Sequence, residues 1–428
     1  MTDAGGRRSL TNVGGKVEQT GNAEASQKLA HALDVSGSID DEESARAHVH
    51  GFHSYPARMH PQTARRLVEA FSPTRGVVLD PFCGSGTVLV EALLASRDAF
   101  GSDINPLAVE LARAKTSRVT KAEADELMAT AIAIAKEADA RRTARAGATR
   151  RLPNEDVVLF SPHVLLELDS LRAGIEKVER PRLKMPLFLA LSAILVKVSL
   201  KRSDTSEQEA PRRIAAGYTA KLFTKKVEEL CHKRADFSHA LTSTKPRVFV
   251  QIDDAAVLSK IAPASVDAVI TSPPYAATYD YLAQHEMRLR WLGLSAKGFE
   301  AAEIGSRRSY APLAGPAAQA RAVSETFGFL SAMAKTLKPD GSIVLVIGDS
   351  AVKKHALRAD VIVTEAAKRA GLFVVARATQ TRQHFHAPTA GAFSSAPRAE
   401  HAILLRHRKV TMVGAPSTRG EGFRSRRS

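Results

Sequence analysis

The chain has 428 residues, of which 44% are hydrophobic and 25% charged, a composition typical of a globular protein. Its two cysteines, Cys83 and Cys231, lie far apart, which argues against a disulfide framework and a cysteine-based zinc site and favours a reducing compartment. The formal net charge of +16 favours a polyanionic partner, and the longest apolar run, Met185 to Val196, is shorter than the roughly 20 residues that a membrane span needs.

Both ends of the chain are rich in polar and charged residues and show no sustained periodicity. We therefore expect residues 1–45 and 411–428 to be flexible tails. The first residues carry arginines but no apolar core of a signal peptide, so we expect a cytoplasmic protein.

Short apolar runs alternate with helical patterns over residues 46–119 and again over 247–410. In chain order, the runs predict strands at 76–79, 99–102, 247–252, 266–270, 342–347, 372–376 and 402–405. Helical patterns occupy 64–71, 88–95, the residues after Asn105, and 361–370. Strands separated by helices predict a parallel, doubly wound α/β sheet, whereas the last two strands, joined by a loop, suit antiparallel pairing.

Residues 120–246 interrupt this alternation. The segment is rich in Ala and Leu, helical in character, and dense in basic pairs such as Arg141-Arg142 and Lys225-Lys226. We interpret it as an inserted helical subdomain and as one candidate surface for a polyanionic partner.

The glycine-rich segment 80–87 follows the first predicted strand and precedes a predicted helix. Gly84 and Gly86 permit a sharp turn and a close approach of the backbone to a ligand. The segment lacks the lysine of a phosphate-binding loop and the third glycine of a dinucleotide fingerprint. An adenosylated ligand without a pyrophosphate remains, and Asp103, at the end of the next strand, suits a ribose diol. Alone, Asp103 could equally be a helix N-terminal aspartate.

The second distinctive segment is Ser272-Pro273-Pro274-Tyr275, directly after a predicted strand. Two prolines stiffen the backbone and leave their carbonyls free to accept hydrogen bonds. The Ser272 hydroxyl and the Pro273 carbonyl can accept from an aromatic amine and free its lone pair, and Tyr275 can stack on an extruded base. The alternative is a plain Pro-Pro turn at a strand end.

The motifs DPFCGSGT (80–87), GSDINP (101–106) and TSPPY (271–275), in this order, resemble those of DNA amino-methyltransferases, specifically the cytosine-N4 group. The resemblance covers about residues 53–408 apart from the helical insert. It implies a Rossmann-like methyltransferase fold with a mostly parallel seven-stranded sheet, and S-adenosylmethionine as cofactor.

The resemblance also implies site residues. The catalytic residues are Ser272, Pro273, Pro274 and Tyr275. The cofactor-binding residues are Tyr55, Pro56, Asp80, Pro81, Phe82, Cys83, Gly84, Ser85, Gly86, Thr87, Asp103, Ile104 and Asp254. Asp254 is preferred over Asp253 as the acid near the adenine ring, and the segment 53–61, which contains Tyr55 and Pro56, is expected to close over the methionine end of the cofactor.

The implied activity is transfer of a methyl group to the N4 amine of a flipped cytosine in double-stranded DNA. Serine at Ser272, where adenine enzymes commonly carry Asp or Asn, favours cytosine, although an adenine-N6 enzyme and an RNA guanine-N2 enzyme remain alternatives. Methylation at cytosine C5 would need a cysteine nucleophile at a position where none occurs. A non-catalytic DNA-binding protein on this scaffold is the remaining alternative. A cognate restriction endonuclease is compatible with this activity, and the oligomeric state stays open.

Three segments are candidates for DNA contact: the helical insert, residues 276–310 and residues 377–398. The second contains Tyr279, Tyr281, Arg288, Arg290, Arg307 and Arg308, and the third contains Arg382, His384 and His386. Aromatic and arginine side chains suit stacking and phosphate contact, although charged runs are often solvated helix faces. The two histidines have no nearby Cys or carboxylate at ligand spacing, so we expect no metal site.

Overall fold

The computed structural model describes residues 16–35, 43, 45–56, 58–203, 209–210, 212–241, 245–384 and 387–408. The expected tail at 411–428 lies outside these residues, as does much of the expected N-terminal tail. None of the described helices is long and apolar enough to cross a membrane.

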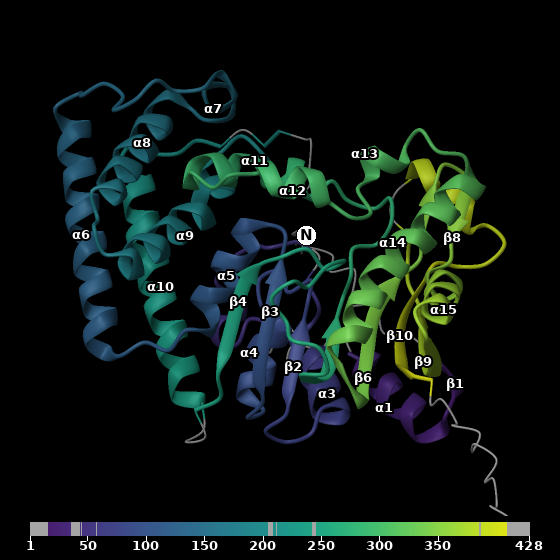
Figure 1. Cartoon of the computed structure of the whole chain (residues 1–428). Helices are drawn as coiled ribbons and strands as arrows, with labels where there is room; N and C mark the ends of the chain where they lie inside the picture. The colour runs from purple at the N-terminus through teal and green to yellow at the C-terminus, as the bar shows by residue number, and fades with distance from the viewer. Residues whose placement is uncertain are drawn as a thin grey trace, which may run out of the picture.

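An eight-stranded sheet forms the centre of the molecule, in the order β1-β9-β10-β6-β5-β2-β3-β4 (Figure 1). Its strands are β1 Val17–Gly21, β2 Val77–Asp80, β3 Asp98–Asp103, β4 Val248–Ile252, β5 Val266–Thr271, β6 Leu337–Gly348, β9 Leu372–Thr381 and β10 Ala399–His407. The pairs from β6 through β5, β2 and β3 to β4 are parallel, and those from β1 through β9 and β10 to β6 are antiparallel. Because β9 and β6 both run against β10, they share one direction.

The strands predicted from apolar runs are all present, with shifts of a few residues at their ends. The last predicted pair, β9 and β10, is antiparallel. The expected Rossmann-like α/β fold with a mostly parallel sheet is therefore confirmed, with β1 as an additional edge strand.

Residues 17–33 are folded, so the expectation of a flexible tail is wrong for them. β1 pairs antiparallel with β9, and α1 (Ala23–Leu33) follows it. The Asn22 side chain caps α1 by accepting a hydrogen bond from the Ala25 N–H at 3.0 Å. β1 carries no apolar pattern because all its residues after Val17 are exposed, so its conformation depends on the hydrogen bonds to β9.

Two apolar cores cover the two faces of the sheet. On β6, Val344 and Val346 pack in the core that contains α1, α3 and α4, whereas Ile343 and Leu345 pack in the core that contains α14 and α15. This alternation is the two-residue period of a strand buried on both faces. The helices beside the sheet are α3 Pro61–Phe71, α4 Thr87–Leu94, α5 Pro106–Thr116, α14 Gly315–Thr336 and α15 Ala359–Arg369.

The segment between α5 and β4 forms a helical region beside the β4 edge of the sheet, at the left of Figure 1. Its helices are α6 Lys121–Thr143, α7 Asn154–Leu159, α8 Pro162–Glu176, α9 Pro181–Val198 and α10 Tyr218–Ala240. α9 is buried along most of its length, which explains the long apolar run of the sequence. This helical region has its own core, to which Trp291 also belongs.

After β5 the chain passes over the carboxyl ends of the parallel strands (Figure 1). The elements of this crossing are α11 Tyr281–Leu292, α12 Lys297–Ala302 and α13 Arg307–Tyr310. Smaller elements are η1 His48–Gly51, the hairpin of β7 Ser350–Val352 and β8 His355–Leu357, and η2 Ala387–Phe393. The crossing places α11 and α12 over the strand ends where ligands bind in open α/β sheets.

Candidate active site

The turn between β2 and α4 holds two glycines in the left-handed region, with φ of +48° at Gly84 and +85° at Gly86. A Cβ at Gly86 would lie 3.1 Å from Ala112 of α5. A Cβ at Gly84 would lie 3.3 Å from the ring of Tyr55. Conformation and space therefore both favour glycine here.

Asp103 ends β3 beside this turn. Its Oδ2 accepts a hydrogen bond from the Gly84 N–H at 2.9 Å, and its Oδ1 accepts one from the Asn105 N–H at 2.9 Å. Burial raises the pKa of Asp103 to about 6, and these backbone hydrogen bonds limit the rise. Each oxygen keeps a lone pair, so the carboxylate can still accept from two ligand hydroxyls.

A cavity opens between this turn, the end of β5, and α12; we call it the glycine-loop cavity. It is lined by Tyr55, Pro56, Pro81, Phe82, Gly84, Asp103, Ile104, Asn105, Asp254, Ala255, Ser272, Pro274, Tyr281, Phe299, Ala302, Glu303 and Ile304. The residues expected to bind cofactor that line it are Tyr55, Pro56, Pro81, Phe82, Gly84, Asp103, Ile104 and Asp254. The structure thus brings together residues from seven separate stretches of the chain.

The other expected cofactor residues are not part of this lining: Asp80, Cys83, Ser85, Gly86 and Thr87. They form the inner side of the turn and are buried. Asp80 accepts hydrogen bonds from the Thr271 hydroxyl at 2.6 Å and from the Phe82 N–H at 3.2 Å, and burial raises its pKa to about 7. Through Thr271, Asp80 ties the glycine turn to the strand that carries the proline loop.

Ser85 accepts a hydrogen bond from a buried lysine. Lys115 of α5 is fully buried, and its Nζ donates to Ser85 Oγ at 3.0 Å. Burial lowers the pKa of Lys115 well below its usual range. Ser85 therefore links the turn to Lys115 of α5. The sequence motif alone does not distinguish residues with such a structural role from those that line the cavity.

Another part of the lining comes from the segment before α3 and from the chain after β5. The Tyr55 hydroxyl accepts a hydrogen bond from Asn105 Nδ2 at 3.2 Å, and its ring stacks on His285, with centroids 4.8 Å apart and planes at 15°. Phe299 and Glu303, in α12 and directly after it, belong to this part of the lining. Tyr55 was expected from the sequence, whereas Phe299 and Glu303 were not, because only the chain crossing after β5 brings α12 to the site.

The two neighbouring acids after β4 lie in different surroundings. Asp254 lines the glycine-loop cavity. Asp253 accepts from the Ser259 hydroxyl at 3.2 Å and from its neighbour's N–H at 3.0 Å, and it is not part of the lining. The geometry therefore favours Asp254 for contact with a ligand.

The proline loop after β5 separates two cavities. Pro274 lines the glycine-loop cavity, whereas Pro273 and Tyr275 line a second one. Ser272 and Tyr281 line both. Ser272 therefore borders the space on both sides of the loop.

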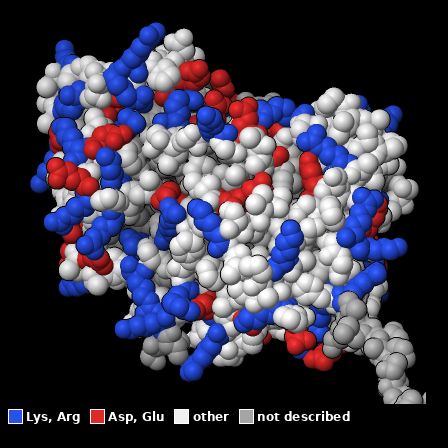
Figure 2. All heavy atoms as spheres, in the orientation of Figure 1, with Lys and Arg blue, Asp and Glu red and all other residues white. Residues whose placement is uncertain are grey.

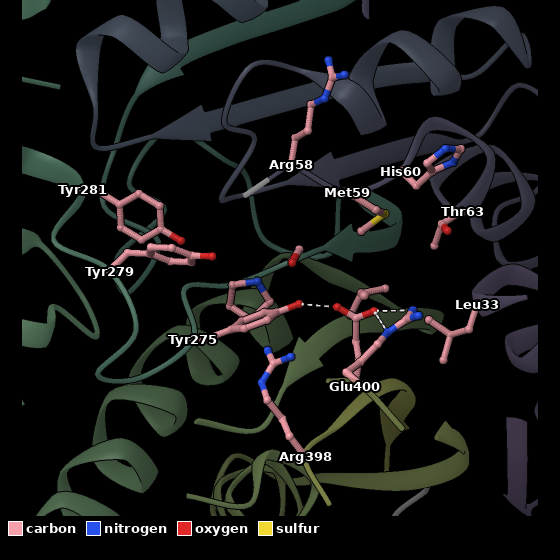
Figure 3. A pocket seen from close by; sticks show the side chains of 14 residues that line it. Leu33, Arg58, Met59, His60, Thr63, Tyr275, Tyr279, Tyr281, Arg398 and Glu400 are labelled. Carbon is pink, nitrogen blue, oxygen red and sulfur yellow. Dashed lines mark hydrogen bonds and ion pairs between the residues drawn. The ribbon is translucent and has the colours of Figure 1, made fainter. Parts of the chain in front are cut away.

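We call the second cavity the tyrosine cavity (Figure 3). It is lined by Leu33, Arg58, Met59, His60, Thr63, Ser272, Pro273, Tyr275, Tyr279, Tyr281, Val346, Arg382, Arg398 and Glu400. Leu33 comes from α1, so the N-terminal segment that was expected to be flexible forms part of this wall. Its apolar and aromatic members, with a few charged groups, suit a planar polar ring.

Tyr275 is held by a buried ion pair. Its hydroxyl donates to Glu400 Oε1 at 2.8 Å, and Arg382 donates to Glu400 Oε2 from Nε at 3.1 Å and from Nη2 at 2.8 Å (Figure 3). Burial and the charge of Glu400 raise the pKa of Tyr275 well above its usual range. Tyr275 therefore remains a protonated, fixed aromatic wall at neutral pH.

Some of the arginines proposed for DNA contact are internal. Arg288 is fully buried and donates to the Ser192 carbonyl, and Arg290 pairs with Asp156 at 2.7 Å. Arg382 is engaged with Glu400, so the expectation of contact with DNA phosphates is wrong for Arg288 and Arg382, which are buried. Figure 2 shows Lys and Arg side chains over much of the visible face, including the helical region at its left.

Among the described residues, one group of side chains has the spacing of metal ligands, namely Asp349, Asp360 and His401, with atoms within 4.8 Å. Asp349 also pairs with Arg358 at 2.8 Å, and Asp360 pairs with Arg377. The two arginines compensate the carboxylate charges, so the group is an ion-pair cluster that ties β9 and β10 to α15.

Comparison with known proteins agrees with this geometry. A family model for DNA methylases of the N6/N4 type matches residues 18–114, which include the glycine turn and Asp103. The Type II methyltransferase M.MvaI of Kocuria varians is 26% identical over 261 residues, 57% of this chain and 58% of that protein. The Type II methyltransferase M.MjaII of Methanocaldococcus jannaschii is 31% identical over 94 residues, 22% of this chain and 18% of that protein. Residues 18–114 of the chain thus resemble DNA methylases of the N6/N4 type.

The chain spans 58% and 18% of the lengths of these two relatives. Among solved structures, the rRNA methyltransferase aviRa of Streptomyces viridochromogenes is 14% identical with a TM-score of 0.32, covering 88% of this chain and 96% of that one. A TehB-like SAM-dependent methyltransferase from Corynebacterium glutamicum is 9% identical with a TM-score of 0.29, covering 81% and 87%. The assignment of the Rossmann-like fold therefore rests on the strand order of the central sheet and not on these two structures.

The glycine-loop cavity fits S-adenosylmethionine, because Asp103 offers acceptors for ribose hydroxyls and Asp254 offers one for an exocyclic amine. Tyr55 and Phe82 add aromatic surface. Ser272 and Tyr281 also line the tyrosine cavity on the other side of the proline loop.

Proposed function

We propose that this protein is a DNA amino-methyltransferase that transfers a methyl group from S-adenosylmethionine to the N4 amine of a cytosine extruded from double-stranded DNA. The observation that carries the proposal is the position of the proline loop between two cavities, with Ser272 open to both. A base must leave the duplex to reach such a site, and the tyrosine cavity is lined by the aromatic side chains that would receive it.

Bound S-adenosylmethionine supplies an electrophilic methyl group on the glycine-loop side of the loop. On the other side, the Ser272 hydroxyl and the Pro273 carbonyl would accept hydrogen bonds from the two hydrogens of the target amine. An amine held in this way becomes pyramidal, and its lone pair turns toward the methyl group. The two prolines keep these acceptors in place because they restrict the backbone.

The fixed ring of Tyr275 would support the extruded base. Its hydroxyl is engaged by Glu400, so the ring cannot swing away without breaking a buried hydrogen bond. Base contact with aromatic side chains contributes about 1–3 kcal/mol per base in other nucleic-acid-binding proteins. Tyr275 thus contributes orientation and binding, while Ser272 and Pro273 act on the amine.

Cytosine is favoured over adenine because Ser272 stands where adenine-specific relatives commonly carry Asp or Asn. Adenine N6 is the second candidate, since both reactions methylate an aromatic amine within the same family. The net charge of +16 favours DNA as the partner. A cognate restriction endonuclease and a cytoplasmic location belong to the same proposal.

Expression in a host that lacks DNA methylation tests the proposal. Nucleosides from the host genome are separated by mass spectrometry, and the genome is sequenced by a single-molecule method that reports modified positions. N4-methylcytosine at one short sequence is the expected result. N6-methyladenine would establish the second candidate, and a genome without modified bases, together with measured cofactor binding, would favour the non-catalytic scaffold or an RNA substrate.

A further inference from the structure

The tyrosine cavity contains a buried arginine that the proposed reaction does not yet use. Arg398 lies directly before β10, is 8% exposed, and lines the cavity together with Ser272 and Tyr275. Its Nε donates to the Asp349 carbonyl at 2.9 Å, and its own carbonyl accepts from the Arg382 N–H at 2.8 Å. The side chain is thus anchored at its base and at Nε.

Neighbouring arginines are paired with carboxylates, whereas Arg398 is not paired with one among the described residues. Arg382 pairs with Glu400, and Arg358 pairs with Asp349, each at 2.8 Å. Within the described part of the chain, Arg398 forms no ion pair and donates no hydrogen bond from its two Nη groups. A cation buried without a carboxylate is unfavourable unless a ligand supplies acceptors.

The glycine at the end of β6, Gly348, leaves room for this guanidinium. A Cβ at Gly348 would lie 2.9 Å from Arg398 Nη2 and 2.7 Å from Tyr275 Cε2. The guanidinium and the tyrosine ring therefore both approach the bare backbone of Gly348. Figure 3 shows Arg398 directed toward Tyr275.

We propose that Arg398 determines base specificity by donating hydrogen bonds to the O2 and N3 atoms of the extruded cytosine. This inference rests on the proposed function. Next to its amine, cytosine carries two adjacent acceptors, N3 and O2, whereas adenine carries one acceptor, N1, followed by a C–H group. A planar guanidinium with two parallel donors matches the cytosine edge.

The proposed contact acts on binding rather than on the chemical step. A donor at N3 withdraws electron density from the ring and does not make the amine more nucleophilic. Arg398 therefore contributes by retaining cytosine in the cavity, while Ser272 and Pro273 act on its amine. Loss of Arg398 is expected to raise KM for DNA more than it lowers kcat.

The first experiment compares Arg398→Met, which keeps an unbranched stem but lacks the guanidinium, with Arg398→Lys, which keeps the charge but not the planar pair of donors. Methyl transfer is measured from labelled S-adenosylmethionine to genomic DNA of a methylation-free host, and the products are separated as nucleosides. We expect Arg398→Met to lower kcat/KM for N4-methylcytosine by about 10- to 100-fold, the range for one bidentate base contact. Arg398→Lys should recover part of this loss.

Two controls separate this effect from damage to the fold. Cofactor affinity, measured by calorimetry, should stay at the wild-type value in both variants. Arg406→Met removes a charge from β10 outside the tyrosine cavity and should leave kcat/KM unchanged. Loss of cofactor binding in Arg398→Met would contradict a role confined to the base.

The second experiment uses a DNA duplex that contains the genomic recognition sequence, with 3-deazacytosine in place of the target cytosine. This analogue keeps the amine and O2 but lacks the N3 acceptor. The wild-type protein should discriminate against it more strongly than Arg398→Met does, and comparing the two proteins cancels the altered reactivity of the analogue. Equal discrimination by both proteins would overturn the inference and indicate contact with a phosphate instead.

The outcomes distinguish the inference from the proposed function. N4-methylcytosine formed by Arg398→Met at the wild-type rate would overturn the role of Arg398 and leave the proposed function intact. N6-methyladenine as the wild-type product would overturn the assignment of Arg398 to a cytosine edge while keeping DNA methylation. No modified base with the wild-type protein would overturn both.

Discussion

The two cavities beside the proline loop are built in different ways. The core of the glycine-loop cavity comes from strand ends and the turns directly after them, and its key residues lie within short motifs of the sequence. The tyrosine cavity takes its walls from α1, the segment before α3, the proline loop and the ends of β9 and β10. A cavity assembled from consecutive residues leaves a local signature, and one assembled from distant elements does not.

The two cavities also differ in the charge of the side chains that line them. The glycine-loop cavity is lined by carboxylates, among them Asp103 and Asp254, which suit hydroxyls and amines of a cofactor. The tyrosine cavity is lined by arginines and one glutamate, which suit the acceptor edge of a base. Variants on the two sides should therefore separate catalysis and base binding from cofactor binding.

The largest effect is expected at the residue that both cavities share. Ser272→Ala removes an acceptor for the target amine and should lower kcat by about 100- to 1,000-fold, as the loss of one transition-state hydrogen bond does elsewhere. Cofactor affinity should change little because the hydroxyl is only one part of that lining. Steady-state kinetics and calorimetry check this, with Ser265→Ala, at the start of β5, as control. Wild-type turnover in Ser272→Ala would remove the serine from the mechanism.

The next effect belongs to the glycine-loop cavity alone. Asp103→Ala removes the acceptor for ribose hydroxyls and the partner of the Gly84 and Asn105 amides. The loss of a charged hydrogen bond, about 1.5–3 kcal/mol, should raise the cofactor Kd by about 10- to 100-fold. Turnover at saturating cofactor should be far less affected.

A matched control for Asp103 is available in Asp253, which lies near the cavity without lining it. Asp253→Ala should bind the cofactor with wild-type affinity in the same calorimetric titration. If both variants lost affinity equally, the selective role of Asp103 would be wrong.

The pH dependence of cofactor binding follows from the same residue. Burial raises the pKa of Asp103 to about 6, so the ionised form that accepts hydroxyl hydrogen bonds is present above pH 6 and is lost as the pH falls through it. The cofactor Kd should therefore rise below pH 6, by at most about tenfold per pH unit for one linked proton. Titrations between pH 5 and 8 check this at intervals of roughly one pH unit. Asp103→Asn should give a flat profile over that interval.

The smallest effect on activity is expected from a variant in α1 that tests whether this helix forms part of the tyrosine cavity. Leu33→Ala should lower the free energy of unfolding by about 2–4 kcal/mol, as buried leucine truncations do, and should lower kcat/KM for DNA by a few-fold. Leu29→Ala removes an equally buried leucine of α1 that does not line the cavity. Denaturant unfolding and methyl-transfer assays on both variants compare them. An equal loss of activity in both would mean that α1 acts through stability alone.

Prediction from the sequence worked where the determining interactions are local. The strands that pack on both faces carry apolar runs, so β5 and β6 were evident, and Gly84 and Gly86 were marked by a turn that disfavours other residues. β1 was missed because its residues are polar and exposed, and hydrogen bonds to β9 hold it in place. Glu400 was missed because a single acid before an apolar run gives no sign that Tyr275 will meet it.

The sequence by itself determined the α/β alternation, the bend at the glycine turn and the stiffness of the proline loop, since these follow from residue types within a few positions of one another. Only the tertiary structure decided which residues of the glycine motif face the cavity, that Arg288 is internal and Arg290 pairs with Asp156, and that Arg398 and α1 complete the tyrosine cavity. The physical reason is that burial and contact are properties of the packed molecule. The same arginine serves as an internal ion-pair partner or as a ligand donor according to whether a carboxylate lies within reach.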